Sequence, residues 1–236
     1  MDNKTETVFI TGIGSGLGKA LAKYYLEKGS KVIALSRHLP QDLKKFENLY
    51  FYRCDLEELE KVYPITEKAL KDTKEISIAW LNAGLLTELK DIHDTPIYEM
   101  ERMMDVNVWA NKIILDCFID LNIKIPSIIA ISSGASVNGN RGWHGYSISK
   151  ASLNMLIKLY SREMDKTKLI ALAPGLILTP MLEKFVLSAD ENKFPSVGRI
   201  KKAPKYSPEE TVELILSKLD KILSFESGSY IDIRKI

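Results

Sequence analysis

A tyrosine and a lysine four positions apart, Tyr146 and Lys150, give the clearest chemical signal in the sequence. On a helix this spacing places both side chains on one face, about one turn apart. An ammonium group near a phenol stabilises the phenolate, and a tyrosine with its ordinary pKa of about 10 needs such help to exchange protons near neutral pH. Ser133 ends the apolar run Ile-Ala-Ile-Ser-Ser, which predicts a buried strand that stops at a site. Alone, the tyrosine–lysine pair would also fit a surface tyrosine beside a solvated lysine.

A glycine-rich loop near the N-terminus follows a predicted strand at residues 7–11 and precedes a helical pattern that ends at Gly29. Glycines allow a tight turn and a close approach of the backbone to a pyrophosphate, which binds at the N-terminus of the helix. In this position the loop predicts a dinucleotide-binding unit, whereas a glycine-rich loop elsewhere would fit a flexible turn. The candidate contacts in the loop are Thr11, Gly12, Gly14, Ser15, Gly16, Leu17 and Gly18.

The end of the second predicted strand, residues 31–35, indicates which dinucleotide would bind. NAD-binding domains tend to have an acidic residue there, which bonds the 2′-hydroxyl of the ribose. In this chain the strand is followed by Ser36 and Arg37. An arginine pairs with the 2′-phosphate of NADP(H), which a carboxylate would repel. The sequence therefore favours NADP(H), with a solvent-facing Arg37 as the alternative.

Strand and helix patterns alternate along the rest of the chain. Further strands are predicted at residues 49–53, 76–81, 127–132, 168–172 and 230–233, and helices at 57–70, 96–121, 145–164 and 208–223. This alternation predicts an α/β fold, a Rossmann-like doubly wound parallel sheet with helices on both faces. The 236 residues suit one domain, 1–236, and are few for two. Residues 182–205 show little periodicity, which predicts a long loop that is either a lid or binding loop or a solvated surface segment.

The bulk properties of the chain exclude several classes of protein. A formal net charge of +2 gives no indication of a nucleic-acid or membrane-surface partner. No apolar run approaches the roughly 20 residues of a membrane helix, and residues 1–7 lack the basic and apolar regions of a signal peptide. Cys54 and Cys117 form no pattern typical of a disulfide framework or a metal site. We therefore expect a cytoplasmic protein with two reduced core thiols and no metal.

These motifs, and others in the same order from Thr7 to the end of the chain, resemble the short-chain dehydrogenase/reductase family. The glycine loop matches the family's Thr-Gly-x-x-x-Gly-x-Gly pattern, and Ser133 with Tyr146-x-x-x-Lys150 matches its catalytic residues. Two positions depart from the family pattern. Ser15 stands where many NADP-dependent members have a basic residue, and Leu81 replaces the first of two asparagines. The resemblance implies a single dinucleotide-binding enzyme domain.

The resemblance also assigns roles to individual residues. It implies four catalytic residues, Asn107, Ser133, Tyr146 and Lys150, with Tyr146 and Lys150 also contacting the cofactor. It implies further cofactor contacts at Asp55 and Leu56 near the adenine, at Asn82, Ala83 and Gly84 behind the cofactor, and at Pro174, Gly175, Ile177 and Thr179 around the nicotinamide. Asn107 is expected to kink its helix and to hold a water against Lys150. From the residues alone, Asp55 would also fit a helix cap, and Asn107 a solvent-facing position.

A narrower resemblance points to the branch of the family that contains bacterial benzil reductase and sepiapterin reductase. It rests on five short stretches, which are Ser132-Ser-Gly-Ala, Gly142-Trp143, Ser149-Lys-Ala-Ser-Leu-Asn-Met155, Ala173-Pro-Gly and Glu226-Ser-Gly-Ser-Tyr-Ile-Asp232. This branch implies an NADPH-dependent carbonyl reductase acting on one carbonyl of a 1,2-dicarbonyl compound, benzil-like or pteridine-like. The alternatives are another oxidoreductase of the family, such as a 3-oxoacyl thioester reductase or an alcohol dehydrogenase, and a non-catalytic protein that binds NADP(H) as a sensor or structural ligand.

The substrate would be a small carbonyl compound, bound where loops follow the ends of the strands. Leu85, Gly134, Trp143 and Met181 lie on such loops and are candidate pocket residues, although each would also fit the core. The helix that carries Tyr146 is apolar on more than one face, so part of it is expected to pack against another subunit. The sequence therefore predicts a homodimer or homotetramer formed through the helices at 96–121 and 145–164, with neither nucleic acid nor membrane as a partner.

Overall fold

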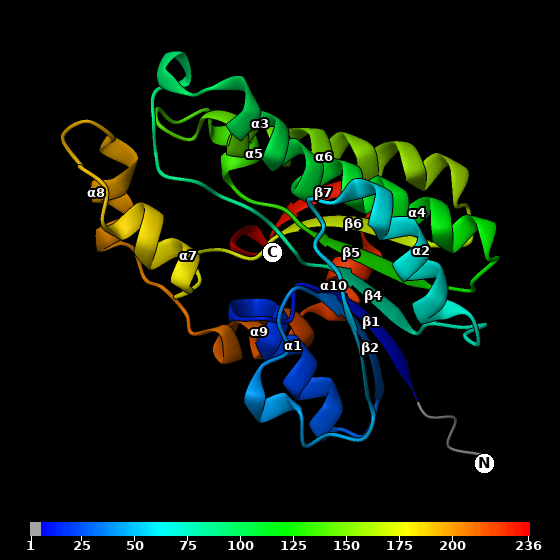
Figure 1. Ribbon diagram of the computed structural model, residues 1–236. Helices are drawn as coiled ribbons and strands as arrows, with labels where there is room; N and C mark the ends of the chain where they lie inside the picture. Colours follow the sequence, from blue (N-terminus) through cyan, green and yellow to red (C-terminus); the bar gives the residue numbers. More distant parts are fainter. Residues whose placement is uncertain (1–5) are drawn as a thin grey trace.

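A single parallel sheet of seven strands organises the chain (Figure 1). The computed structural model describes residues 6–236. Residues 1–5, to which most of the expectation about a signal peptide refers, lie outside the described residues. The strand order is β3-β2-β1-β4-β5-β6-β7, and every neighbouring pair is parallel. The strands are β1 (Thr7–Thr11), β2 (Lys31–Ser36), β3 (Leu49–Arg53), β4 (Ile78–Leu81), β5 (Ser127–Ile131), β6 (Lys168–Ala173) and β7 (Ser229–Asp232).

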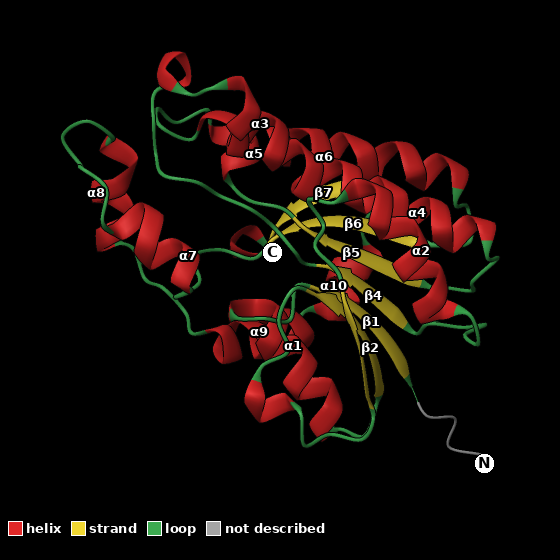
Figure 2. Cartoon of the chain, viewed as in Figure 1, coloured by secondary structure: helices red, strands yellow, loops and turns green. Residues whose placement is uncertain are grey.

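Helices cover both faces of this sheet (Figure 2). They are α1 (Gly16–Glu27), α2 (Leu59–Leu70), α3 (Ile97–Met104), α4 (Ala110–Asp120), α5 (Ala135–Asn138), α6 (His144–Glu163), α7 (Pro180–Leu182), α8 (Pro195–Lys202), α9 (Pro208–Ser217) and α10 (Leu219–Ser224). Buried side chains of α1, α9 and α10 share one hydrophobic cluster with the sheet, and those of α2, α4 and α6 share the other. The predicted doubly wound α/β fold is confirmed.

The central strands are buried because apolar side chains leave them on both faces. In β1, Val8 and Ile10 pack into the cluster of α1 and α9, while Phe9 packs into the cluster on the opposite face. This alternation follows from the two-residue period of a strand, and a strand covered on both faces needs apolar residues at every position. Phe9 also meets Phe118 of α4 edge to face, with ring centres 5.1 Å apart. The continuous apolar runs in the sequence thus correspond to strands that helices cover on both sides.

The helix predicted at 96–121 is interrupted in its middle. Its first part is α3 and its last part is α4, and between them residues Asp105–Trp109 form a π-helical turn, η3. A π turn admits one extra residue and changes the direction of the side chains that follow. Asn107 lies in this turn and is completely buried. The expected break in the helix at Asn107 is therefore present, and the alternative of a solvent-facing asparagine is wrong.

The segment 182–205 contains more regular structure than the sequence predicts. A π-helical turn, η4 (Glu183–Leu187), follows α7, and α8 lies closer to the C-terminal end of the segment. Val186, Phe194 and Val197 are buried in a third hydrophobic cluster, which also contains Trp143. The prediction of a long irregular loop is wrong, because these short helices are stabilised by docking on that cluster and carry no periodicity long enough to recognise.

The chain has no candidate membrane helix among its described residues, and its two cysteines are unpaired. Within residues 6–236, no helix combines the length and apolar character needed to cross a membrane. Cys54 and Cys117 are free and buried, as predicted. Burial raises the pKa of Cys54 to about 11 and that of Cys117 to about 12, so both remain thiols at neutral pH and are poor nucleophiles.

Candidate active site

The glycine loop joins β1 to α1, and its geometry requires glycine at three positions. Gly12 and Gly16 have φ angles of 77° and 57°, in the left-handed region that disfavours other residues. A Cβ atom at Gly18 would lie 2.2 Å from the carbonyl oxygen of Gly12 and 2.3 Å from the side-chain nitrogen of Asn82. The loop brings the first-turn N–H groups of α1 to the end of the sheet, which is the arrangement that a phosphate group needs.

Thr11 and Asn82 tie this loop to the loop that follows β4. The Thr11 hydroxyl accepts hydrogen bonds from the backbone N–H groups of Asn82 at 3.0 Å and Ala83 at 3.1 Å. The Asn82 side chain donates to the carbonyl oxygens of Thr11 at 3.0 Å and Gly12 at 3.1 Å. Thr11 is completely buried, so it supports the predicted cofactor site from behind and does not line it.

One cavity of about 400 Å³ opens where the loops after strands β1 to β6 meet. Apart from Thr11, every residue predicted to contact the cofactor lines this cavity. The strand order reverses between β1 and β4, and doubly wound sheets bind ligands at such reversals. A helix N-terminus and a glycine backbone without side chains form one end of the cavity, and both fit the pyrophosphate of a dinucleotide.

Ser36 and Arg37 line the part of the cavity that lies beside β3. The side chain of Arg37 is 58% exposed, and its guanidinium lies 4.0 Å from the carboxylate of Asp55. Asp55 also accepts a hydrogen bond from the backbone N–H of Glu57 at 3.2 Å, so it caps the turn before α2 while it lines the cavity. The loosely paired guanidinium is free to turn towards a phosphate group held in the cavity.

Ser133, Tyr146 and Lys150 meet at the floor of the same cavity. Burial raises the pKa of Tyr146, and the neighbouring Ser133 side chain offsets part of that rise. Lys150 is 3% exposed and donates a hydrogen bond to the Ile131 carbonyl oxygen at 2.8 Å. Its Nζ atom lies 5.9 Å from the centre of the Tyr146 ring. Burial lowers the pKa of Lys150 to about 8, so the ammonium form still predominates at neutral pH.

Asn107 joins the loop after β4 to helix α6 and does not line the cavity. Its side-chain oxygen accepts a hydrogen bond from the backbone N–H of Leu85 at 2.7 Å. Its nitrogen donates to the Leu85 carbonyl oxygen and to the Ser149 hydroxyl, both at 2.9 Å. A Cβ atom at Gly84 would lie 3.4 Å from the Asn107 oxygen and 3.3 Å from Lys150 Nζ, so Asn107 and Lys150 flank the same glycine.

The wall of the cavity in front of Tyr146 is apolar. Leu85, Trp143 and Met181, three of the predicted pocket residues, line it together with Leu86, Leu182 and Val186. Gly134, the fourth predicted pocket residue, is not among the lining residues. A Cβ atom at Gly134 would lie 3.3 Å from the Arg234 guanidinium, so this glycine faces the C-terminal segment of the chain.

Gly142 and Trp143 anchor the segment that carries α8. The indole N–H of Trp143 donates a hydrogen bond to the Ser196 hydroxyl at 3.0 Å. Gly142 has a φ angle of 93°, and a Cβ atom there would lie 2.5 Å from the ring of Phe194. Trp143 therefore has two structural roles: its ring forms part of the cavity wall, and its N–H binds the segment that carries α8.

The sequence of residues 6–189 matches the family model described as short chain dehydrogenase. This chain belongs to that family. Its curated relatives include benzil reductase ((S)-benzoin forming) from Bacillus subtilis (strain 168), which is 28% identical over 243 residues that span 98% of this chain and 99% of the relative. The resemblance to the benzil reductase branch is thereby confirmed. A 3-oxoacyl-[acyl-carrier-protein] reductase from Thermotoga maritima is also 28% identical, over 97% of this chain and 96% of that protein.

Several solved structures share the fold of this chain. The KRED1-Pglu enzyme superposes with a TM-score of 0.82 at 22% sequence identity, covering 96% of this chain and 100% of that one. Levodione reductase superposes with a TM-score of 0.80 at 18% identity, covering 97% and 95% of the two chains. At this level of identity the likeness establishes the Rossmann-like architecture.

The residues that line the cavity of this short-chain dehydrogenase without being predicted from the sequence include Val106, Leu182 and Val186. Val106 lies in the π-helical turn, and Leu182 and Val186 lie in the segment predicted as a loop. The spacing of four between Leu182 and Val186 is the sequence feature that could have indicated a helix here, because it places two side chains on one helical face. A single such pair also occurs in many loops, so only the tertiary contacts distinguish it.

Proposed function

We propose that this protein is an NADPH-dependent carbonyl reductase whose substrate is one carbonyl of an apolar 1,2-dicarbonyl compound. The observation that carries this proposal is that Ser133 and Tyr146 line one cavity together with the buried Lys150 and a set of apolar side chains. Two hydroxyl groups in one cavity suit an oxygen that gains negative charge during a reaction. The names of the benzil reductases among the relatives agree with this chemistry.

Each of the site residues has its own role in the proposed carbonyl reduction. A nicotinamide dinucleotide, held by the glycine loop and the loops after β4 and β6, would supply the hydride. Ser133 donates a hydrogen bond to the substrate oxygen and stabilises its developing charge. Tyr146 transfers its proton to that oxygen as general acid, and the Lys150 ammonium stabilises the phenolate that remains. Asn107 keeps the β4 loop and α6 in register through its bonds to Leu85 and Ser149.

The apolar wall favours a neutral aromatic diketone over a charged or carrier-bound substrate. The side chains that line the cavity in front of Tyr146, such as Trp143, Met181 and Leu85, offer no charge for a carboxylate or phosphate. Apolar surfaces with a few placed polar groups are typical of sites for small uncharged ligands. A second carbonyl withdraws electrons from the attacked carbon, so the reaction requires less stabilisation from Ser133.

Reduction rates on four carbonyl compounds test this choice of substrate. We expect kcat/KM for benzil and 1-phenyl-1,2-propanedione to exceed that for acetophenone by about tenfold or more, which corresponds to about 1.4 kcal/mol of the activation barrier. The fourth compound is an acetoacetyl thioester, and all four are followed by the loss of NADPH absorbance. A higher kcat/KM for the thioester than for either diketone would contradict the proposed substrate class while leaving the assignment of Ser133 and Tyr146 intact.

Arg37 is expected to make NADPH the preferred cofactor. A contact between the guanidinium and the 2′-phosphate is charge-assisted, but the exposure of this side chain limits it to about 1 to 2 kcal/mol, or roughly 5- to 30-fold in kcat/KM. Replacing Ser36→Asp together with Arg37→Ile should shift the preference towards NADH. The control is Arg53→Ile, at the exposed end of β3 and outside the cavity lining. Equal kcat/KM for NADPH and NADH in the unmodified protein would refute this assignment.

The outer faces of α3, η3, α4 and α6 are the proposed subunit interface. They expose a series of large apolar side chains, which are Ile97, Tyr98, Trp109, Ile119, Ile148, Met155 and Leu159. Met155 and Leu159 lie one turn apart on α6 and are 55% and 57% exposed. Apolar side chains gathered on one surface commonly mark a contact with another protein, and we propose a homodimer or homotetramer.

Light scattering during gel filtration measures the oligomeric state directly. We expect an oligomer for the unmodified chain and a monomer for the double variant Met155→Glu with Leu159→Glu, because two charges cannot be buried unpaired in the interface. Ile92→Glu, an equally exposed apolar residue outside these helices, is the control and should leave the oligomer intact. A monomeric unmodified protein would exclude this interface.

A further inference from the structure

Asn154 lies on the face of α6 that also carries Tyr146 and Lys150. The three residues are spaced by four along the helix, and this spacing places their side chains one above another. Tyr146 and Lys150 point into the main cavity, whereas Asn154 does not line it. The reaction proposed above gives Asn154 no part, although its hydrogen bonds lead directly to Ser133.

The amide of Asn154 binds on both sides of Ser133. Its oxygen accepts a hydrogen bond from the Ser132 hydroxyl at 2.6 Å, and its nitrogen donates to the Ser136 hydroxyl at 2.9 Å. The Ser136 hydroxyl in turn donates to the backbone carbonyl oxygen of Ser133 at 2.7 Å. One side chain of α6 thus fixes the residue before Ser133 and, through Ser136, the carbonyl group of Ser133 itself.

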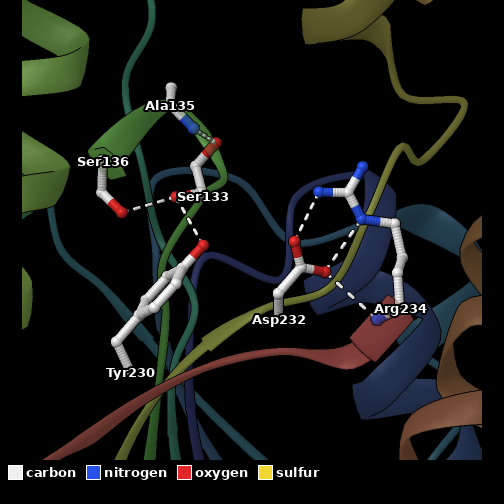
Figure 3. Close-up of polar contacts among 6 residues, drawn as sticks. All are labelled: Ser133, Ala135, Ser136, Tyr230, Asp232 and Arg234. Carbon is white, nitrogen blue, oxygen red and sulfur yellow. Dashed lines mark hydrogen bonds and ion pairs between the residues drawn. The ribbon is translucent and has the colours of Figure 1, made fainter. Parts of the chain in front are cut away.

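The hydroxyl of Ser133 is oriented by the same turn (Figure 3). The backbone N–H of Ala135 donates a hydrogen bond to Ser133 Oγ at 3.1 Å. A hydroxyl oxygen has two acceptor sites and one proton, so this bond leaves one acceptor site and the proton for Tyr146 and a substrate oxygen. A rotation of the turn would redirect that proton.

The Ser133 turn also has hydrogen bonds that do not involve Asn154. The Ser133 carbonyl oxygen accepts one from the backbone N–H of Ser136 at 3.0 Å. Tyr230 of β7 also approaches the Ser133 carbonyl oxygen, but at 3.4 Å (Figure 3), which is long for a hydroxyl donor and indicates a weak bond. The shorter bonds through Asn154 are a side-chain link between this turn and α6.

We propose that Asn154 is a positioning residue that holds the Ser133 hydroxyl in register with Tyr146. The inference rests on the proposed function, because it assigns Asn154 a role in the same carbonyl reduction. Both hydroxyl groups must reach one substrate oxygen, and a misplacement of about 1 Å can lower a rate by roughly 100-fold. Asn154 lies on α6, the helix that also carries Tyr146 and Lys150. Its hydrogen bonds therefore connect the turn that holds Ser133 to the helix that holds Tyr146.

Asn154→Leu removes both hydrogen bonds and keeps the number of side-chain heavy atoms and the branching at Cγ. We expect kcat for ketone reduction to fall by about 10- to 100-fold, with the dissociation constant for NADPH changed by less than about twofold. The matched control is Asn48→Leu. Asn48 also donates two hydrogen bonds, to the Leu26 carbonyl oxygen at 3.1 Å and the Ser30 carbonyl oxygen at 2.7 Å, in a part of the chain that does not line the site. The Asn48→Leu variant should have a lower melting temperature than the unmodified protein and the same kcat.

A double-mutant cycle separates positioning of Ser133 from a general structural effect. If Asn154 acts through Ser133, Asn154→Leu should lower kcat no further in a Ser133→Ala background. Losses that multiply in the double variant, or an Asn154→Leu protein with more than half of the original kcat, would overturn the inference while leaving the proposed function in place.

Hydrogen exchange provides a readout that does not depend on turnover. The backbone amides of residues 132–136 report on the turn even if the wild-type protein reduces no ketone, a result that would refute the proposed function itself. We expect Asn154→Leu to accelerate the exchange of these amides by about tenfold or more relative to both the wild type and Asn48→Leu. Unchanged exchange in this segment would contradict the role of Asn154.

Discussion

Tyr146→Phe is expected to lower kcat for ketone reduction by at least about 100-fold, because it removes the general acid. The phenyl ring keeps the packing of Tyr146 against Trp143, whose ring centre lies 5.9 Å away, so the fold and the cavity should persist. NADPH binding, followed by cofactor fluorescence, should therefore be retained. The loss of rate is measured with saturating NADPH and the best diketone substrate.

The control for this variant is another tyrosine whose hydroxyl is bonded outside the site. Tyr63 donates a hydrogen bond to Asp120 at 3.0 Å on the exposed surface between α2 and α4. Tyr63→Phe should leave kcat within about twofold of the original value, since surface changes of this kind have small effects. A Tyr146→Phe protein with more than a tenth of the original rate would show that proton transfer does not depend on this hydroxyl.

Gly18→Ala is expected to destabilise the protein by about 3 kcal/mol or more, because the new methyl group meets the Gly12 backbone and the Asn82 side chain, which two hydrogen bonds hold in place. The Gly12 carbonyl oxygen and the Asn82 side chain would both lie closer than 2.5 Å to the added Cβ. For a chain of this size such a loss lowers the melting temperature by roughly 10 °C. Added NADPH should give little further stabilisation, because the loop can no longer form its binding geometry.

Gly14→Ala is the matched control within the same loop. A Cβ atom at Gly14 would lie 3.5 Å from the Ser36 hydroxyl and 3.6 Å from the His38 carbonyl oxygen, which are ordinary contacts. Melting curves without cofactor should therefore be nearly unchanged for Gly14→Ala and strongly shifted for Gly18→Ala. Equal melting temperatures for the two variants would mean that the loop adjusts more freely than its contacts suggest.

The parts of the structure that follow local rules could be predicted from the sequence. The apolar runs predicted the strands, and their alternation with helical patterns predicted the doubly wound sheet. The tyrosine–lysine spacing placed both side chains on one face of α6, and the position of Asn107 marked the break between α3 and α4. Each of these features depends on residues close together in the chain, where periodicity and turn chemistry are informative.

The parts that depend on distant contacts could not be predicted. Thr11 was expected to contact the cofactor, but its bonds to the loop after β4 place it behind the cavity. Gly134 was expected in the substrate pocket, but Arg234, one hundred positions later, faces it. The helices between residues 182 and 205 form on a cluster that includes Trp143. No local pattern encodes which of these segments will meet.

Transfer of deuterium from the cofactor tests the central claim most directly. The protein is incubated with NADPH that carries deuterium at C4 of the nicotinamide and with the diketone of highest kcat/KM, and the product is examined by mass spectrometry. The account predicts one deuterium on the new carbinol carbon, formed by the wild type and greatly reduced for Tyr146→Phe. NADPH that binds but is not consumed, or an alcohol product without deuterium, would contradict it.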